Sequence, residues 1–417
     1  MNSVDELMTR ALPDGWAWKT MGDIADVVSG GTPSTSDASN FENGDIPWLT
    51  PADLSGYTAK FVSGGARRLT QKGLHSCSAK LIPAGAVLFT SRAPIGYVAI
   101  ASNPISTNQG FKNFVLRDEV LPEYVYWWLK GAKQLAKSLA SGTTFLEISG
   151  TNAKKLPIPI APLATQREIV AELEKQFSRL DEAVANIQRV KSNLKRYKAS
   201  VLNDAVEGRL LASDSPAVLV KLGSVANLID PQPSHRTPPT HPDGVPYIGI
   251  GDVLENGKLD FQNARKVSPT VLEEHRARYT LRVGDFIFGK IGTLGRPTLL
   301  TPPFTYTLSA NVVLVQADGV RLLPEYALIF MDSPKLLNMI NRDAKATTQA
   351  AYGIKRMRDL EINIPDIEQQ RKIVAEVDRH LSIIREIEAE VDANLKRAQA
   401  LRQATLAKAF GIGSSRI

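Results

Sequence analysis

The feature of this sequence that most constrains its fold is an internal repeat of about 200 residues. Residues 156–173 read LPIPIAPLATQREIVAEL, and residues 360–377, LEINIPDIEQQRKIVAEV, match them at a distance of 204 positions. Residues 121–124 (LPEY) match 323–326 at 202 positions, and residues 22–25 match 223–226 at 201. These matches occur in the same order in both halves, with small changes in spacing that short loop insertions would produce. The chain is therefore expected to contain one fold twice.

The first 160 residues or so of each half have the pattern of a β-rich domain. Short apolar runs at 87–90, 97–100, 286–288 and 312–315 are separated by Gly, Pro, Ser and Thr, which predicts strands joined by turns. Few helices are predicted there, the best being residues 123–139. A mixed domain dominated by β structure is expected in each half.

The end of each half has the pattern of a long helix. Apolar residues recur every seven positions, a spacing typical of a coiled-coil seam, and Gly208 and Gly411 stand where the two helices should end. The seam consists of Leu173, Leu180, Ile187, Leu194 and Val201, then Val377, Ile384 and Val391. Two matching helices in one chain favour an antiparallel intramolecular coiled coil, about 40 residues and roughly 60 Å long. The alternative is that each helix covers only its own domain.

These patterns together predict an α+β fold with a pseudo-twofold repeat. The expected segments are a first β-rich domain (1–161), a central helical region (162–212), a second β-rich domain (213–365) and a C-terminal helical region (366–417). Such an arrangement would place two similar globular domains at two separate positions on one partner.

Composition narrows the possible functions. The 417 residues carry a net charge of +7, compatible with a polyanionic partner but also common among soluble proteins. No run of 18 apolar residues is present, so we expect no membrane span and a cytoplasmic location. Cys77 is the only cysteine and the five histidines lack metal-ligand spacing, which argues against disulfides and bound metals.

Motifs for catalysis are incomplete. Residues 301–304 (TPPF) come close to the Asn/Asp-Pro-Pro-Tyr/Phe motif of adenine methyltransferases, but Thr301 has neither the amide nor the carboxylate. Residues 284–290 match part of a phosphate-binding loop, yet Ile291 stands where the magnesium-binding hydroxyl belongs, and the interior predicts a strand. We therefore expect a chain that is not itself an enzyme.

Basic and polar residues on predicted loops are the candidates for DNA contacts. Arg and Lys would bind phosphates, whereas polar side chains on loops 29–36, 90–92, 107–109, 233–237, 289–293 and 347–349 would reach base edges. Each loop is also an ordinary turn by pattern alone. The candidates are Thr32, Ser34, Arg67, Arg68, Ser91, Arg92, Asn108 and Gln109 in the first half, and His235, Arg236, Lys290, Thr293, Asn311, Thr348 and Gln349 in the second.

The order of a globular part, Leu-Pro-Ile-Pro, Gln-Arg-x-Ile-Val and a heptad helix, repeated twice, resembles the specificity subunit of type I restriction–modification enzymes. Residues 156–172 and 360–376 carry the resemblance, supported by residues 22–24, 30–33, 46–48, 88–92 and 105–109. The likeness covers nearly the whole chain. In the second half, Pro233, Ser234 and His235 depart from the Gly-Gly-Thr-Pro loop of the first half.

The resemblance implies that each globular domain reads one half of a split sequence in double-stranded DNA. The paired helices would set the spacing and dock two modification subunits, which carry S-adenosylmethionine and methylate adenine. Restriction subunits, which use ATP and Mg²⁺, would join them. The docking and coiled-coil residues implied are Gln166, Arg167, Leu173, Leu180, Ile187, Leu194, Gln370, Arg371, Val377, Ile384 and Val391. The alternatives are a coiled-coil scaffold, an inactive specificity variant, or a stand-alone methyltransferase or nuclease.

Overall fold

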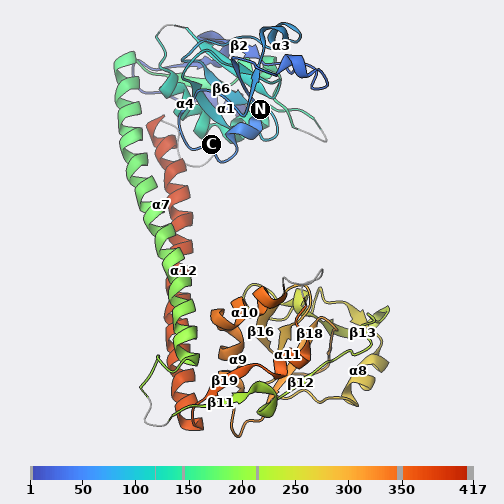
Figure 1. The fold of residues 1–417 in the computed structure, drawn as a ribbon. Helices are drawn as coiled ribbons and strands as arrows, with labels where there is room; N and C mark the ends of the chain where they lie inside the picture. Colours follow the sequence, from blue (N-terminus) through green and yellow to red (C-terminus); the bar gives the residue numbers. More distant parts are fainter. Residues whose placement is uncertain (1–2, 118, 143–145, 213–215, 345–350, 411–417) are drawn as a thin grey trace. The chain divides into compact units, whose positions relative to one another are not determined.

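The computed structural model describes residues 3–117, 119–142, 146–212, 216–344 and 351–410 (Figure 1). By contacts between residues, the chain forms two compact units. Unit 1 consists of residues 1–187 and 393–417, and unit 2 of residues 188–392. Each unit therefore contains one β-rich domain together with part of each long helix.

The first β-rich domain lies in unit 1 and contains three sheets. A five-stranded sheet has the order β2-β9-β6-β7-β4, a three-stranded sheet the order β5-β3-β8, and β1 pairs with β10. The strands are β1 (Ala17–Thr20), β2 (Ala25–Ser29), β3 (Ile46–Leu49), β4 (Phe61–Val62), β5 (Arg67–Leu69), β6 (Val87–Thr90), β7 (Val98–Ala101), β8 (Ser106–Thr107), β9 (Phe111–Leu116) and β10 (Pro157–Ile160). The helices are α1 (Ser3–Met8), α2 (Met21–Ile24), α3 (Gln71–His75), α4 (Pro122–Gly131), α5 (Lys133–Ser138), α6 (Gly150–Lys154) and the long α7 (Leu163–Val206).

Unit 2 repeats this topology. Its sheets have the orders β12-β18-β15-β16, β14-β13-β17 and β11-β19, which correspond in chain order to those of unit 1 with the exception of strand β4. The strands are β11 (Val218–Lys221), β12 (Ala226–Ile229), β13 (Thr240–Ile248), β14 (Lys266–Val267), β15 (Phe286–Gly289), β16 (Gly295–Leu299), β17 (Thr307–Leu308), β18 (Val312–Ala317) and β19 (Glu361–Ile364). The helices are α8 (Pro269–Arg276), α9 (Pro324–Asp332), α10 (Pro334–Ala344), α11 (Ile354–Arg358) and the long α12 (Ile367–Ala409). The repeat inferred from the sequence is thus a repeat of the fold.

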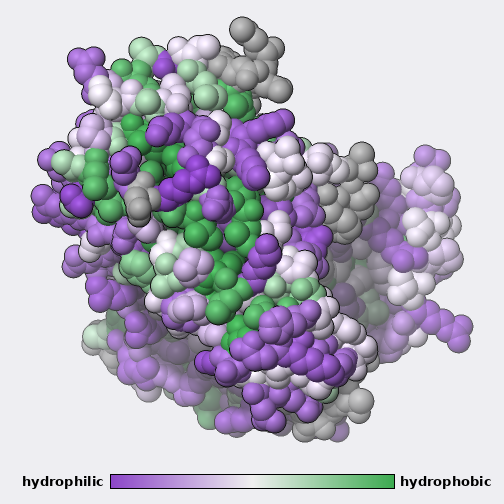
Figure 2. Space-filling model, turned by 90° about the horizontal axis from the view of Figure 1, so that it is seen from above, coloured by the Kyte–Doolittle hydropathy of each residue, from purple (hydrophilic) through white to green (hydrophobic). Residues whose placement is uncertain are grey.

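Apolar side chains of unit 1 are mostly buried, but some remain on its surface. Figure 2 shows a face of the molecule on which hydrophilic residues surround a hydrophobic area. The large apolar side chains left exposed in the β-rich part of this unit are Tyr57, Phe61, Leu81 and Leu146.

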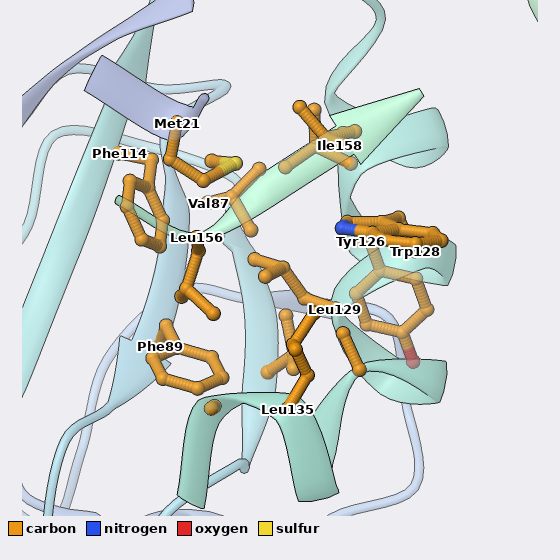
Figure 3. Packing of buried hydrophobic residues seen from close by; sticks show 14 of the residues in the cluster. Met21, Val87, Phe89, Phe114, Tyr126, Trp128, Leu129, Leu135, Leu156 and Ile158 are labelled. Atoms are coloured by element: carbon orange, nitrogen blue, oxygen red, sulfur yellow. The ribbon is translucent and has the colours of Figure 1, made fainter. Parts of the chain in front are cut away.

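The main core of unit 1 lies between the large sheet and helix α4. In Figure 3, Val87, Phe89 and Phe114 from the sheet face Leu129 and Leu135 from the helices. These side chains are at most 9% exposed. Because β6 is buried on both faces, its first three residues, Val87 to Phe89, are all apolar, and the strand lies where residues 87–90 predict it.

The long helices form the predicted antiparallel coiled coil, seen within each unit by itself. In unit 1 the start of α7 packs on the end of α12, where Asp181 pairs with Arg402. In unit 2 the end of α7 packs on the start of α12, where Tyr197 Oη lies 2.8 Å from His380 Nδ1. The seam residues Leu173, Leu194, Val201, Val377, Ile384 and Val391 are buried, and Leu180 and Ile187 are half-buried. The heptad pattern therefore marks the buried face of both helices.

Details of the predicted elements differ in one place. The helix predicted over 123–139 is two helices, α4 and α5, because Ala132 leaves helical geometry at ψ 18°. The predicted strands are confirmed, and α7 ends at Val206, two residues before Gly208, whose φ is +71°. Gly411 lies outside the described residues. The domain boundaries at 161, 212 and 365 remain predictions.

Candidate nucleic-acid interface

Three of the predicted loops of the first domain meet at one place. Gly31 N–H donates to Thr107 O at 2.9 Å, and Ser91 N–H donates to Gly110 O at 2.7 Å. A side chain at Gly30 would put its Cβ 2.1 Å from Asn108 O, so glycine is required for the loops to approach this closely. Loops 29–36, 90–92 and 107–109 therefore form a single cluster.

This cluster brings together polar candidates that are distant in sequence. The Thr32 hydroxyl donates to the Gln109 side-chain carbonyl, and Ser34 Oγ lies 2.8 Å from Ser36 Oγ. Ser34 and Gln109 are exposed, whereas Thr32 and Asn108 are half-buried. Asn108 Oδ1 accepts from Gly110 N–H at 2.9 Å, which leaves its amide group to hydrogen-bond elsewhere. The first cluster thus presents hydroxyl and amide groups, which are suited to base edges.

The two adjacent arginines are both exposed but are held differently. The Arg67 guanidinium lies 3.6 Å from the centre of the Phe41 ring and 5.8 Å from that of Trp48. This stacking is a cation–π interaction that orders the side chain while leaving its N–H groups free to donate. Arg68 Nη1 donates to Asp45 O at 2.9 Å. Because both side chains are already exposed, each can contact a phosphate or a base without any rearrangement of the domain.

Two candidates of loop 90–92 do not lie free on the surface. Ser91 is fully buried, and its Oγ lies 3.4 Å from the buried ammonium of Lys112. Arg92 Nη1 lies 3.2 Å from Glu147 Oε2, and Lys112 Nζ lies 3.4 Å from Glu147 Oε1. We therefore correct the interpretation of Ser91: its burial makes it a support of the loop rather than a contact residue.

Lys290 requires the same correction in the second domain. It is 4% exposed, and its Nζ lies 2.7 Å from Asp230 Oδ2. Its backbone N–H donates to Asn311 O at 2.9 Å, and its carbonyl accepts from Tyr352 N–H at 2.9 Å. Ser91 makes the equivalent backbone bonds to Gly110 and Ile148. Lys290 is therefore a buried residue that connects the loops of the second domain, and its side chain does not project from them.

The remaining candidates of the second domain lie on loops at its surface. His235, Arg236 and Thr293 are exposed, and His235 has a positive φ of 51°. Asn311 is half-buried, and its Oδ1 accepts from Ile250 N–H at 3.2 Å. Thr348 and Gln349 lie outside the described residues. His235, Arg236 and Thr293 are therefore the accessible candidates of this domain.

A carboxylate supports the turn beside each cluster. Burial alone would raise the pKa of Asp53, but hydrogen bonds from Thr50 and from Ala66 N–H outweigh it and lower that pKa. At the repeat-related position Gly249 has no hydroxyl, and burial raises the pKa of Asp252. The backbone turn is kept in both domains, while its hydrogen bonding differs.

Several residues that shape these clusters have no recognisable signal in the sequence. Phe41 supports Arg67, Glu147 holds Arg92, and Asp230, Gln232 and His275 hold the 233–237 loop through contacts described below. Their partners are 26 to 60 positions away in sequence, so no local spacing reveals them.

The glutamines of the repeated Gln-Arg motif are not at a docking surface. Gln166 is 1% exposed; its Oε1 accepts from Leu121 N–H at 3.0 Å, and its Nε2 donates to Glu119 O and Ala161 O. Gln370, fully buried, makes the equivalent bonds to Leu323 N–H, Arg321 O and Pro365 O. Their assignment to docking is therefore corrected: each joins the start of a long helix to the loop before α4 or α9.

Arg167 and Arg371, the next residues of the motif, are exposed. Arg371 Nε lies 3.6 Å from Glu368 Oε1 on the same helix. These arginines keep their place as docking candidates, because their side chains project from the helices into solvent.

In the described parts of the chain, no three His, Cys, Asp or Glu side chains come together to hold a metal ion. Among the described helices, none has both the length and the apolar composition needed to cross a membrane.

Comparisons with known proteins agree with this architecture. The family described as "Type I restriction modification DNA specificity domain" matches residues 13–195 and again residues 216–397. The MjaIX specificity subunit of Methanocaldococcus jannaschii is 41% identical over 177 residues, which cover 42% of this chain and 40% of that one. The EcoBI specificity subunit of Escherichia coli is 23% identical over 428 residues, covering 96% of this chain and 86% of that one.

Solved structures share the fold. A chain from a study of complex assembly and conformational transition in a type I restriction–modification system superposes with a TM-score of 0.76 at 19% identity, covering 97% of this chain and all of that one. The HsdS subunit from Thermoanaerobacter tengcongensis superposes with a TM-score of 0.57 at 20% identity, covering 96% and 98%. The two family matches span both halves of the repeat, and the chain therefore belongs to the family of type I restriction–modification specificity subunits.

Proposed function

We propose that each β-rich domain reads one half of a bipartite, asymmetric site in double-stranded DNA. The observation that carries this proposal is the gathering of loops 29–36, 90–92 and 107–109 in unit 1, and of the corresponding loops around Lys290 in unit 2. The backbone scaffold is the same in both domains, while the polar side chains on the loops differ. Two related scaffolds with different loops are suited to two different half-sites.

The accessible residues divide into two roles. Arg67, Arg68 and Arg236 are exposed cations, which bind phosphates or the O6 and N7 atoms of guanine. Thr32 and Gln109 carry a hydroxyl and an amide, which can hydrogen-bond to base edges. Loss of a phosphate contact should weaken all sequences alike and reduce the salt dependence, whereas loss of a base contact should relax one position of the site.

The long helices are proposed to set the spacer between the half-sites and to dock two modification subunits. These subunits would supply S-adenosylmethionine and methylate an adenine in each half-site after flipping it out of the stack. Restriction subunits, with ATP and Mg²⁺, would complete the nuclease. The exposed Arg167 and Arg371 support the docking role, because they project from helices whose apolar seams are already occupied.

The proposal is tested by sequencing DNA methylation in a host that expresses this chain with its modification subunit. A bipartite motif methylated in both halves is expected, and neither protein alone should produce it. A stable complex that adds no methylation would contradict the proposal and favour a scaffold role.

A further inference from the structure

A chain of hydrogen bonds runs from a buried histidine to the exposed loop 233–237 of unit 2. It begins at His275, a residue of α8 that is 1% exposed. His275 Nδ1 lies 2.5 Å from Thr307 Oγ1 and 3.2 Å from Tyr279 Oη, and its Nε2 lies 2.6 Å from Gln232 Oε1. The Gln232 amide group donates to Ser234 Oγ at 3.0 Å and to Arg236 O at 3.1 Å. The core of the domain is thus linked directly to the loop.

The donors and acceptors of this chain can be assigned. Arg236 O only accepts, so the Gln232 amide nitrogen faces the loop and its carbonyl oxygen faces His275. The carbonyl only accepts, so His275 Nε2 carries the proton and Nδ1 accepts from a hydroxyl. Burial lowers the pKa of His275, which agrees with a neutral ring. Each bond in the chain polarises the next, which makes the arrangement cooperative.

A second contact holds the same loop from its start. Gln232 N–H donates to Asp230 Oδ1 at 3.2 Å, and Asp230 Oδ2 pairs with the buried Lys290 at 2.7 Å. His235 N–H donates to Gln232 O at 3.0 Å. Gln232 therefore uses both its backbone and its side chain to fix the segment that presents His235 and Arg236.

The first domain lacks this chain at the matching place. Ser106 pairs in register with Trp48, as Thr307 pairs with Tyr247, so Ser106 corresponds to Thr307. Ser106 Oγ is buried without a hydrogen-bond partner among the described residues. Counted from the N-caps Thr70 and Ser268 of α3 and α8, the position of His275 is held in the first domain by Cys77, which packs against the apolar cluster there. Among the described residues, the chain of hydrogen bonds from His275 through Gln232 to the loop therefore occurs in the second domain alone.

We propose that Gln232 and His275 are positioning residues that hold loop 233–237 in its base-reading conformation. They make the base preference of one half-site depend on side chains that do not touch DNA. The inference rests on the proposed function, because it assumes that this loop reads bases.

The test uses the full chain in complex with its modification subunits and reads the methylated motif. Gln232→Met keeps the side-chain length but removes the amide, and His275→Asn keeps a polar group near the Nδ1 position but loses the Nε2 donor. Both variants should relax the half-site read by the second domain, with discrimination at the affected base reduced roughly 5- to 150-fold. His275→Gln keeps a donor near the Nε2 position and should preserve the motif. Ser106→Ala, which removes a hydroxyl without a hydrogen-bond partner in the first domain, should leave both half-sites unchanged.

The outcomes separate this inference from the proposed function. If the wild-type complex methylates a bipartite motif and both loss variants keep it unchanged, only the positioning role is refuted. Equal relaxation of both half-sites would also refute it, since the chain of bonds is confined to unit 2. Absence of a bipartite motif with the wild-type complex overturns the proposed function and this inference with it. Gln232 lies in a half-buried loop position, so its variant gives a result even if His275→Asn fails to fold.

Discussion

Replacing Gln166 by methionine should destabilise unit 1 rather than remove a docking contact. Methionine has a similar length and shape but makes none of the three hydrogen bonds that join Gln166 to Leu121, Glu119 and Ala161. At about 1 kcal/mol for each bond, the free energy of unfolding should fall by about 3 kcal/mol. With a urea m-value near 3 kcal/mol per molar, the unfolding midpoint should fall by about 1 M.

The placement of the tryptophans makes the assay specific for one unit. All five tryptophans of the chain lie in unit 1, so tryptophan fluorescence follows the unfolding of that unit alone: Trp16, Trp18, Trp48, Trp127 and Trp128. Gln166→Met should therefore shift the fluorescence transition. Gln370→Met, the matched change in unit 2, should shift a transition seen by far-ultraviolet circular dichroism and leave the fluorescence transition in place.

Arg167→Ala is the control, because an exposed neighbour on the same helix should change stability by no more than about 0.5 kcal/mol. The reasoning is refuted if Gln166→Met unfolds at the wild-type midpoint yet fails to bind modification subunits. That result would return the glutamine to the docking surface implied by the family resemblance.

Three further changes test other parts of the structure. Phe410 is 1% exposed, and its ring packs edge-on against Trp128 with 5.2 Å between the ring centres. Phe410→Ala should lower the free energy of unfolding of unit 1 by about 3–5 kcal/mol, measured by fluorescence-detected denaturation. A loss below about 1 kcal/mol would contradict this packing. Phe41→Leu removes the ring that orders Arg67 and should cost only about 0.5–1 kcal/mol in stability, while relaxing the first half-site in methylation sequencing and sparing the second. Burial, aided by a neighbouring arginine, lowers the pKa of His275 from 6.5. The unfolded state therefore binds more protons, and the free energy of unfolding of unit 2 should fall as pH drops below about 6.5. His275→Gln should flatten that dependence, as measured by denaturation at several pH values.

Much of the fold is predictable because its signals are local. Burial of one face every seven residues gives the seam of α7 and α12, and burial on both faces gives the apolar run of β6. The break between α4 and α5 has only a weak local signal, since Gly131 lowers helix propensity but Ala132 is an excellent helix former. Tertiary packing of the chain around that residue decides its conformation.

The candidate site was less predictable because polar residues serve two purposes. Ser91 and Lys290 are of residue types that often contact DNA, and the sequence predicts them on the surface of their loops. Both are buried inside the domain instead. Gln232 and His275 gave no signal, because their partners lie on other elements. A polar residue in a loop shows its role only when the groups around it are known.

The comparison of the two domains separates supporting residues from reading residues. Gln166 and Gln370 make the same three bonds, and Ser91 and Lys290 make the same two backbone bonds, although the last pair differs entirely in side chain. Positions where the backbone role is shared but the side chain is free to change can diverge without cost to the fold. The loops that such positions support can then acquire different sequences in each domain. An internal repeat that keeps its glutamine bonds and varies its loops is therefore suited to recognising two unlike half-sites with one scaffold.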